Sequence, residues 1–363
     1  MKILSLGLDN SLLDKTSALA VRVVEYGELV ERYTVIVPSR KNEQVELSEK
    51  VKIYGSGGGD KLTQFFKIYN LAKRLLRDRS YDVITAQDQY YLALIGLRLA
   101  KKFKVGLEIQ VHGFERFSGL RKLIAQYILP RADAVRCVSQ RLQKQLVGRF
   151  GVEEERLTVV PIFTNLKNSI LETKERINDG KFIFLTVGRL VAVKNIGLQI
   201  AAMAEVAKKY PATELWIIGD GSELNNLKQQ ILNLRLERSI VMLGRKDNLD
   251  EYYSKADAFL LTSSSEGWGL AVIEAASFRL PIIMTDVGCA GEIIQDGQSG
   301  LVIPVGGKQK LVEAMLKIIE DQDLRKRLGE HAKMAVSRLP SKTEILDLYK
   351  ASWQKALAEK LNK

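Results

Sequence analysis

The sequence predicts an α/β protein of two doubly wound parallel-sheet domains that face each other across a cleft. Three observations lead to this fold class. Short apolar segments alternate with longer amphipathic ones, each apolar segment ends in a Gly, Asp or Ser cluster, and the series starts afresh near residue 181. The length of 363 residues agrees, because one domain takes about 100–200 residues.

The first domain is expected over residues 1–163. Its short apolar segments predict buried strands, and the stretches between them have helical periodicity. The expected strands cover residues 2–8, 33–38, 81–86, 104–112, 133–139 and 157–161, and the clearest helices cover 61–80 and 91–103.

The second domain is expected over residues 181–340. The polar segment 164–180 contains no strand pattern and is interpreted as a linker, and residues 341–363 form a final helix that carries Trp353. Periodicity does not decide where that helix packs. The expected strands of this domain cover residues 181–189, 214–220, 239–244, 258–264, 281–286 and 300–304.

Charge and cysteine content restrict the setting. The net charge is +12, and residues 1–160 hold 27 Lys and Arg against 18 Asp and Glu. This basic half could meet nucleic acid, anionic lipid or a phosphorylated substrate. Cys137 and Cys289 are the only cysteines, which excludes a disulfide framework and favours a reducing compartment. The first apolar run is too short for a signal peptide or a membrane span, so we expect a cytoplasmic protein.

The densest motif is the segment SSEGWGLAVIEAASFRLP, residues 264–281. Gly267 and Gly269 allow the backbone to approach a ligand closely, and the amides that begin the next helix suit an anion or a sugar hydroxyl. Glu266 and Glu274 are separated by seven residues. Since a carboxylate accepts two hydroxyls well, the pair could hold two polyol groups of one ligand.

Two further strand ends carry polar loops. In VGRLVAVKN, Gly188 ends a strand, and Arg189 and Lys194 precede a helix, where two cations would suit a diphosphate. In IIGDGSEL, Gly219 and Gly221 form a tight turn that lacks the last glycine of a dinucleotide-binding loop.

A functional histidine is expected at the end of a first-domain strand, where doubly wound folds place ligands. This residue is His112, in IQVHGFE. There is no phosphate-binding GxxxxGK[ST] loop and no Cys/His metal spacing. The pair Asp321 and Asp323 has a metal-binding form, but it lies at a helix boundary and is interpreted as a helix cap.

These motifs together resemble the retaining glycosyltransferases of family 4, which have the GT-B fold. The resemblance covers nearly the whole chain. It rests on YDVITAQ, IQVHGFE, ADAVRCVSQ and VVPIFTN in the first half, and on VGRLVAVKN, IIGDGSEL and SSEGWGLAVIEAASFRLPIIMTDVGCAGEII in the second.

The resemblance implies a role for each motif. Arg189 and Lys194 would bind the donor diphosphate, Glu266 would lie near the transferred sugar, Glu274 on the donor ribose, and His112 beside the reacting sugar. The family usually needs no metal, its donors are nucleotide sugars such as UDP- or GDP-sugars, and its final helix crosses back to the first domain. The remaining residues expected to contact the donor are Gly188, Gly219, Gly221, Arg245, Gly267, Trp268, Gly269 and Leu270.

The chain departs from the family after its first strand. Family members commonly have a Gly-Gly turn there, whereas this chain reads GLDNSLLDKTSA. Asp9, Asn10 and Ser11 could line the cleft instead, which affects how the acceptor would be bound.

The expected activity is transfer of a hexose-type sugar to a glycan or lipid-linked acceptor, in cell-surface polysaccharide or glycolipid synthesis. The basic first domain could place the enzyme at the inner face of an anionic membrane. Three alternatives stay open: a sugar-nucleotide epimerase of the same fold, a transferase that makes a small soluble disaccharide, and a catalytically silent sugar-nucleotide-binding subunit. Nucleic-acid binding has only the charge in its favour, since no stacking-aromatic motif accompanies it.

Overall fold

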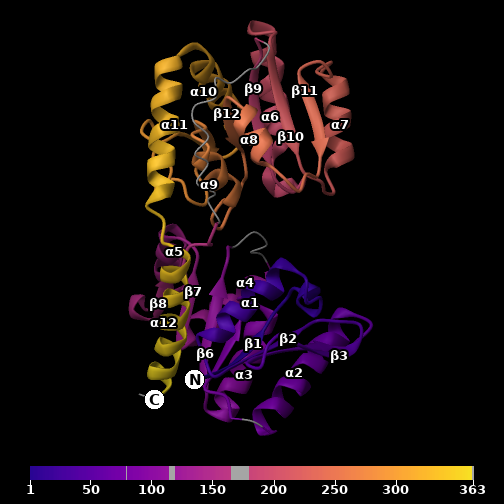
Figure 1. Cartoon of the computed structure of the whole chain (residues 1–363), viewed down its shortest axis with the longest axis vertical. Helices are drawn as coiled ribbons and strands as arrows, with labels where there is room; N and C mark the ends of the chain where they lie inside the picture. Colours follow the sequence, from indigo (N-terminus) through magenta and orange to yellow (C-terminus); the bar gives the residue numbers. More distant parts are fainter. Residues whose placement is uncertain (79, 114–118, 165–179, 362–363) are drawn as a thin grey trace. The chain divides into compact units, whose positions relative to one another are not determined.

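The fold is described from a computed structural model, for residues 1–78, 80–113, 119–164 and 180–361 (Figure 1). The chain forms two compact units. Unit 1 comprises Met1–His112, Arg116–Pro161 and Pro340–Lys363, and unit 2 comprises Gly113–Glu115 and Ile162–Leu339. The predicted linker lies outside the described residues except at its two ends, residues 164 and 180.

Unit 1 is built on an eight-stranded sheet in the order β3-β4-β2-β1-β5-β6-β7-β8. Every neighbouring pair is parallel except β3 and β4, which are antiparallel. The strands are β1 (Lys2–Leu6), β2 (Arg32–Val37), β3 (Asn42–Glu46), β4 (Val51–Ser56), β5 (Val83–Ala86), β6 (Gly106–Val111), β7 (Ala134–Cys137) and β8 (Leu157–Val159).

Helices α1 and α5 of unit 1 each begin at a serine cap. Ser17 accepts a hydrogen bond from the amide of Ala20 at the start of α1, and Ser139 accepts one from Leu142 at the start of α5. The helices are η1 (Asn10–Leu13), α1 (Ala18–Glu28), α2 (Lys61–Asp78), α3 (Tyr91–Phe103), α4 (Gly119–Ile128), η2 (Leu129–Arg131), α5 (Gln140–Phe150), η3 (Glu154–Arg156) and α12 (Lys342–Leu361).

Helix α12 belongs to unit 1, where it packs along β6, β7 and β8 (Figure 1). Its Trp353 is fully buried in the core. A polar cluster lies beneath the same helix: Arg136 Nε is 3.4 Å from Glu108 Oε1, and Ser352 Oγ donates to that oxygen over 2.6 Å. The Arg136 guanidinium lies over the ring of Tyr349, 3.7 Å from its centroid. Apolar burial of Trp353, the hydrogen bond from Ser352 and the contact between Tyr349 and Arg136 therefore hold α12 on the sheet.

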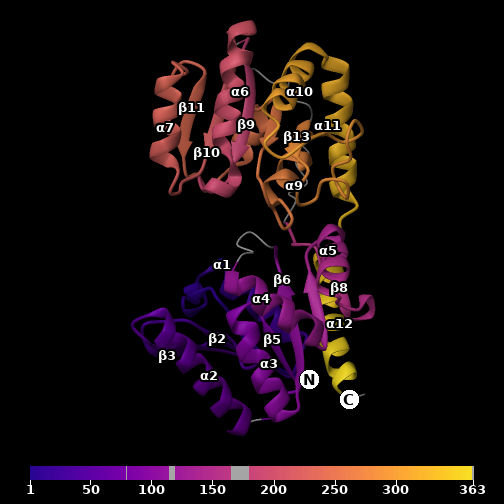
Figure 2. The same cartoon turned by 180° about the vertical axis from the view of Figure 1, so that it is seen from behind.

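Unit 2 is a fully parallel six-stranded sheet in the order β11-β10-β9-β12-β13-β14. Figure 1 shows α8 and α9 in front of this sheet, and Figure 2, seen from behind, shows α6 in front of it. Helices therefore cover both faces, and the central strands are buried. The strands are β9 (Phe182–Val187), β10 (Thr213–Ile218), β11 (Ile240–Gly244), β12 (Ala258–Leu261), β13 (Ile282–Thr285) and β14 (Leu301–Ile303).

The helices of unit 2 include the predicted cap. Asp321 Oδ1 accepts a hydrogen bond of 2.8 Å from the amide of Leu324 in the first turn of α11, as the capping interpretation required. The helices are η4 (Ala192–Lys194), α6 (Ile196–Lys209), α7 (Leu224–Asn233), α8 (Asp250–Lys255), α9 (Leu270–Ser277), α10 (Lys308–Glu320) and α11 (Gln322–Ser337).

The predicted fold class of two doubly wound parallel sheets is confirmed, and two strands were missed. β3 and β4 lie at one edge of the unit 1 sheet, next to β2. The residues of β3 are polar and mostly exposed, and β4 contains Lys52 and Gly55. Neither strand therefore has the continuous apolar run that identifies a central parallel strand. Among the described residues, no helix is both long and apolar enough to cross a membrane.

Candidate active site

The candidate site of unit 2 is built on loops that follow β9, β10 and β12. Since these strands are parallel neighbours, their carboxyl ends meet at one edge of the sheet. The loop after β9 runs from Gly188 to Asn195, which has φ 47° and leads into α6. Thr262 Oγ1, after β12, donates to the carbonyl of Asn195 over 3.0 Å, and the amide of Ser264 donates to that of Val193 over 2.8 Å. The two loops are thus fixed to each other.

Glycines allow the loops after β9 and β10 to touch backbone to backbone. A Cβ on Gly219, which has φ 145°, would lie 1.8 Å from the carbonyl oxygen of Gly188. A Cβ on Gly221 would lie 2.3 Å from that of Leu190. The amide of Leu190 donates to the carbonyl of Asp220 over 2.8 Å. Both glycines predicted in IIGDGSEL therefore shape the loop that carries the predicted cations.

A cation and a carboxylate meet between these loops. Lys194 Nζ lies 2.5 Å from Glu266 Oε1, and Ser263 Oγ donates to the same oxygen over 2.7 Å. The Lys194 side chain is 19% exposed and that of Glu266 only 8%. The structure thus brings together two predicted site residues that are 72 positions apart in the sequence. Both contacts are made by Oε1 of Glu266, and neither involves Oε2.

The turn after Glu266 is held by contacts with the segment around Gly288 and Cys289. Gly269 has φ 99° and precedes α9, and Trp268 is buried, with its carbonyl accepting a hydrogen bond of 2.9 Å from the amide of Cys289. A Cβ on Gly288 would lie 2.6 Å from that carbonyl oxygen. The Trp268 indole Nε1 has no hydrogen-bond partner among the described residues. At the first position of α9, Leu270 is exposed.

The second predicted carboxylate lies on α9. Tyr253 Oη, on α8, donates to Glu274 Oε2 over 2.8 Å. Burial raises the pKa of Glu274, the hydrogen bond from Tyr253 opposes that rise, and the negative charge of Asp250 adds to it. Burial likewise raises the pKa of the Tyr253 phenol, and the Glu274 charge raises it further, so the phenol stays a donor.

Two predicted cations are more open. Arg189 is exposed on the loop after β9. Arg245 is on the loop between β11 and α8, with its side chain 83% exposed and its Nε 3.9 Å from Asp247 Oδ1. The structure does not bring Arg245 into contact with the Lys194–Glu266 pair.

His112 follows β6 at the carboxyl end of the unit 1 sheet. The residue keeps exposed surface, yet desolvation by the surrounding protein and, to a lesser extent, the positive charge of Arg136 lower the pKa of His112 to about 4. The imidazole is therefore neutral near pH 7. It belongs to unit 1, whereas the other predicted site residues belong to unit 2.

Sequence reasoning missed Ser263 and Tyr253. Ser263 carried a weak signal, because it precedes Glu266 by three residues in a polar turn after a strand. Tyr253 carried none, since one tyrosine in an amphipathic helix is typical of ordinary packing. Only the tertiary structure places its hydroxyl on Glu274.

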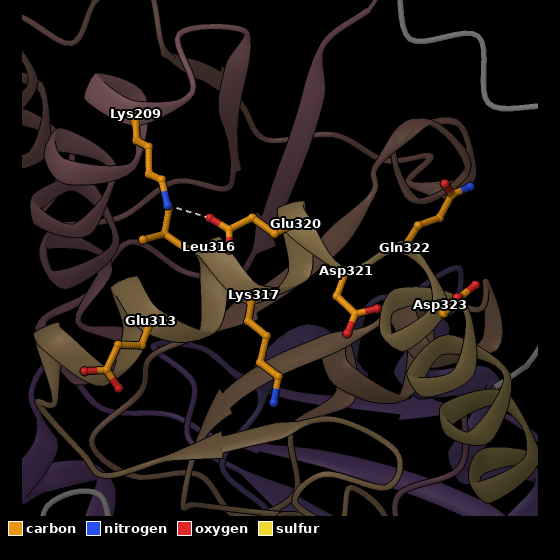
Figure 3. Close-up of a pocket in the computed structure, with 8 residues that line it drawn as sticks. All are labelled: Lys209, Glu313, Leu316, Lys317, Glu320, Asp321, Gln322 and Asp323. Atoms are coloured by element: carbon orange, nitrogen blue, oxygen red, sulfur yellow. Dashed lines mark hydrogen bonds and ion pairs between the residues drawn. The ribbon is translucent and has the colours of Figure 1, made fainter.

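A separate hollow of about 710 Å³ lies beside α10, near the end of α6 and the start of α11 (Figure 3). Lys209 lies 2.6 Å from Glu320 there, and both side chains are solvent-exposed. The hollow contains none of the predicted site residues. Its lining residues are Lys209, Glu313, Leu316, Lys317, Glu320, Asp321, Gln322 and Asp323.

Comparison with known proteins adds an independent line of observation. The family model described as Glycosyl transferases group 1 matches residues 168–335, and the one described as Glycosyltransferase Family 4 matches residues 27–168. The N-acetyl-alpha-D-glucosaminyl L-malate synthase of Bacillus anthracis is 26% identical over 267 residues, covering 71% of this chain and 68% of that protein.

A second relative and a solved structure are similar to the chain as well. The alpha-monoglucosyldiacylglycerol synthase of Streptococcus pneumoniae is 26% identical over 281 residues, 70% of this chain and 62% of that protein. The crystal structure of Anabaena Alr3699/HepE in complex with UDP and glucose has a TM-score of 0.76 at 20% identity and covers 98% of this chain and 99% of that one.

Proposed function

Because this chain belongs to the family 4 glycosyltransferases and has their GT-B fold, we propose that it transfers a hexose-type sugar from a nucleoside diphosphate sugar, with retention of anomeric configuration. The observation that carries the proposal is the Lys194–Glu266 pair, held by Ser263 at the carboxyl edge of the unit 2 sheet. It sets a cation for phosphate next to a carboxylate for sugar hydroxyls. The solved relative with UDP and glucose supports the same ligand class.

In the proposed reaction, unit 2 holds the donor. Arg189 and Lys194 take up the negative charge that develops on the departing diphosphate, so the step requires no metal. Glu274 binds the ribose, and the backbone of residues 267–270 faces the sugar and phosphate. The base would lie near Gly244 and Arg245.

The bond between the sugar's anomeric carbon and the diphosphate oxygen breaks as the acceptor hydroxyl attacks from the same face. The acceptor proton passes to the leaving phosphate oxygen. Glu266 orients the sugar rather than acting as a base, because Lys194 and Ser263 already bind its Oε1. His112 is neutral near pH 7 and hydrogen-bonds the sugar.

The acceptor would be a glycan or a lipid-linked molecule bound by unit 1, at the cytoplasmic face of a membrane. The relative that makes a glucosyl-diacylglycerol supports a lipid acceptor. Helix α4 supports membrane contact, because Leu120, Leu123 and Tyr127 are exposed beside Arg121 and Lys122. Co-sedimentation with anionic liposomes at low salt tests this part, and failure to sediment would contradict it.

The first experiment is a thermal-shift screen of the purified protein against UDP, GDP and ADP. A ligand at 100 times its dissociation constant stabilises the folded state by about 2.7 kcal/mol. We expect one diphosphate to raise Tm, and the shift to disappear in Lys194→Ala. If none of the three raises Tm, the proposed donor site is wrong.

Turnover separates the enzyme from its alternatives. With the matching sugar nucleotide, we expect slow donor hydrolysis without acceptor. Binding without hydrolysis or transfer would indicate a silent subunit, and recovery of an epimerised sugar nucleotide would indicate an epimerase.

A further inference from the structure

The pair formed by Tyr253 and Glu274 is a feature that the proposed mechanism does not yet use. Tyr253 is 2% exposed, and its Oη donates to Glu274 Oε2 over 2.8 Å. Its ring stacks on the ring of Phe278 with the centroids 5.3 Å apart, and its centroid lies 6.2 Å from that of the Phe259 ring. The ring fills a place that a phenylalanine would fill equally well, so the packing does not account for the hydroxyl.

The hydroxyl restricts the carboxylate. The last torsion of a glutamate is broad and nearly two-fold, so a carboxylate on α9 without a partner samples many orientations. A hydrogen bond from a rigid, buried ring fixes Oε2 and, with it, the plane of the whole group. A carboxylate has about four acceptor positions, and one bond to Tyr253 leaves the others for ligand hydroxyls.

We infer that Tyr253 is a positioning residue for the donor ribose: it orients the Glu274 carboxylate so that this group can accept both hydroxyls of a ribose diol. The inference rests on the proposed function, because it requires Glu274 to bind the nucleoside. It gives α8 a part in donor recognition that no motif in the sequence indicates. It also makes the ribose hydroxyls, rather than the sugar or the phosphates, the groups whose recognition depends on Tyr253.

The test compares ribose and deoxyribose ligands. The nucleoside diphosphate that binds the wild type, with its 2′-deoxy and 3′-deoxy forms, is titrated by calorimetry into the wild type and Tyr253→Phe. Because a hydrogen bond to a charged group is stronger than one between neutral groups, we expect the wild type to prefer the ribose form at least tenfold over one deoxy form. In Tyr253→Phe this ratio should fall to about threefold or less, and the KM for the donor should rise by a larger factor than kcat falls.

Two controls separate positioning from loss of structure. Tyr210→Phe removes a matched contact, a phenol that donates to Glu320 over 2.8 Å on the exposed surface of unit 2, and should leave the ratio unchanged. Glu274→Ala removes the carboxylate through which Tyr253 would act, so adding Tyr253→Phe to it should not reduce the ratio further.

The outcomes distinguish failure of the positioning role of Tyr253 from failure of the proposed function. A wild type that binds and prefers ribose, with the same preference in a folded Tyr253→Phe, overturns the positioning role and leaves the proposed function standing. If Tyr253→Phe fails to fold, an unchanged ratio in Glu274→Ala overturns it, since Glu274 would then not bind the ribose. If no nucleoside diphosphate binds the wild type, both conclusions fall.

Discussion

Replacing Lys194 by methionine removes a cation that lies 2.5 Å from Glu266 Oε1 and keeps a side chain of similar length. The Glu266 carboxylate, on a side chain only 8% exposed, would then keep the Ser263 hydroxyl as its partner. Removing one partner of a fully buried ion pair costs about 3–5 kcal/mol. Lys194 is partly exposed and Ser263 remains, so we expect about 2 kcal/mol, or about 4–8 °C in the Tm of a unit of this size.

The same substitution should reduce turnover by a separate route. Loss of one preorganised group that faces developing negative charge costs about 10²–10³ in kcat. The assay is a thermal scan without ligand together with initial rates of donor hydrolysis. Both are measured for the wild type, Lys194→Met, Glu266→Gln and the double variant.

The double variant separates the two effects. The amide introduced by Glu266→Gln is neutral, so no unpaired charge remains beside Ser263, and we expect Tm to return to near the wild-type value. Turnover should stay low, because neither the cation nor the carboxylate is present. If the double variant instead recovers most of the wild-type rate, the pair supports only the fold, and its assignment to the donor site is wrong.

Three other predictions follow from contacts described above. Gly219→Ala should destabilise unit 2 by at least about 2 kcal/mol in urea unfolding, because its Cβ would overlap the carbonyl oxygen of Gly188. The control is Gly148→Ala on α5, which has open space around it and should be neutral or slightly stabilising. Equal effects of the two substitutions would contradict the loop contact. Arg136→Met should cost about 3–5 kcal/mol by leaving Glu108 buried without its cation, and Glu108→Gln added to it should restore part of the loss; additive losses would argue against the pair. In His331→Gln, which leaves one histidine, the imidazole signals of His112 should titrate near pH 4 in proton NMR. The pKa of His112 is lower in the folded state than the ordinary value of 6.5, so the unfolded chain binds this proton more tightly than the folded chain does. Protonation of His112 therefore destabilises the fold as pH falls from about 6.5 towards 4. A midpoint near 6.5 would mean that the ring is not desolvated.

Much of this architecture could be predicted, because each strand and the loop that follows it are contiguous in the sequence. The segment predicted as a strand over residues 258–264 is β12 over Ala258–Leu261, and its last residues form the polar turn that reaches Glu266. Asp321 was identified as a cap from its position alone. Strand β3 could not be found, because an exposed edge strand has no apolar pattern to mark it.

The contacts between elements were beyond the sequence. Lys194 was expected to bind phosphate, but its pairing with Glu266 depends on where β9 and β12 lie in the sheet. Tyr253 shows the same limit more clearly, since the residue it contacts lies on a different helix. The family resemblance implied roles for single residues, and the structure adds which of these residues contact each other.

The return of α12 to unit 1 has a consequence for synthesis on the ribosome. Residues 162–339 separate β8 from the helix that covers it. At about 5–20 residues per second, the ribosome needs about 10–35 s to make that stretch. During this time the side of β6, β7 and β8 that α12 later covers is open to water and to chaperones, while unit 2 can already fold. A chain stalled before residue 340 would therefore carry a finished second unit and an unfinished first one.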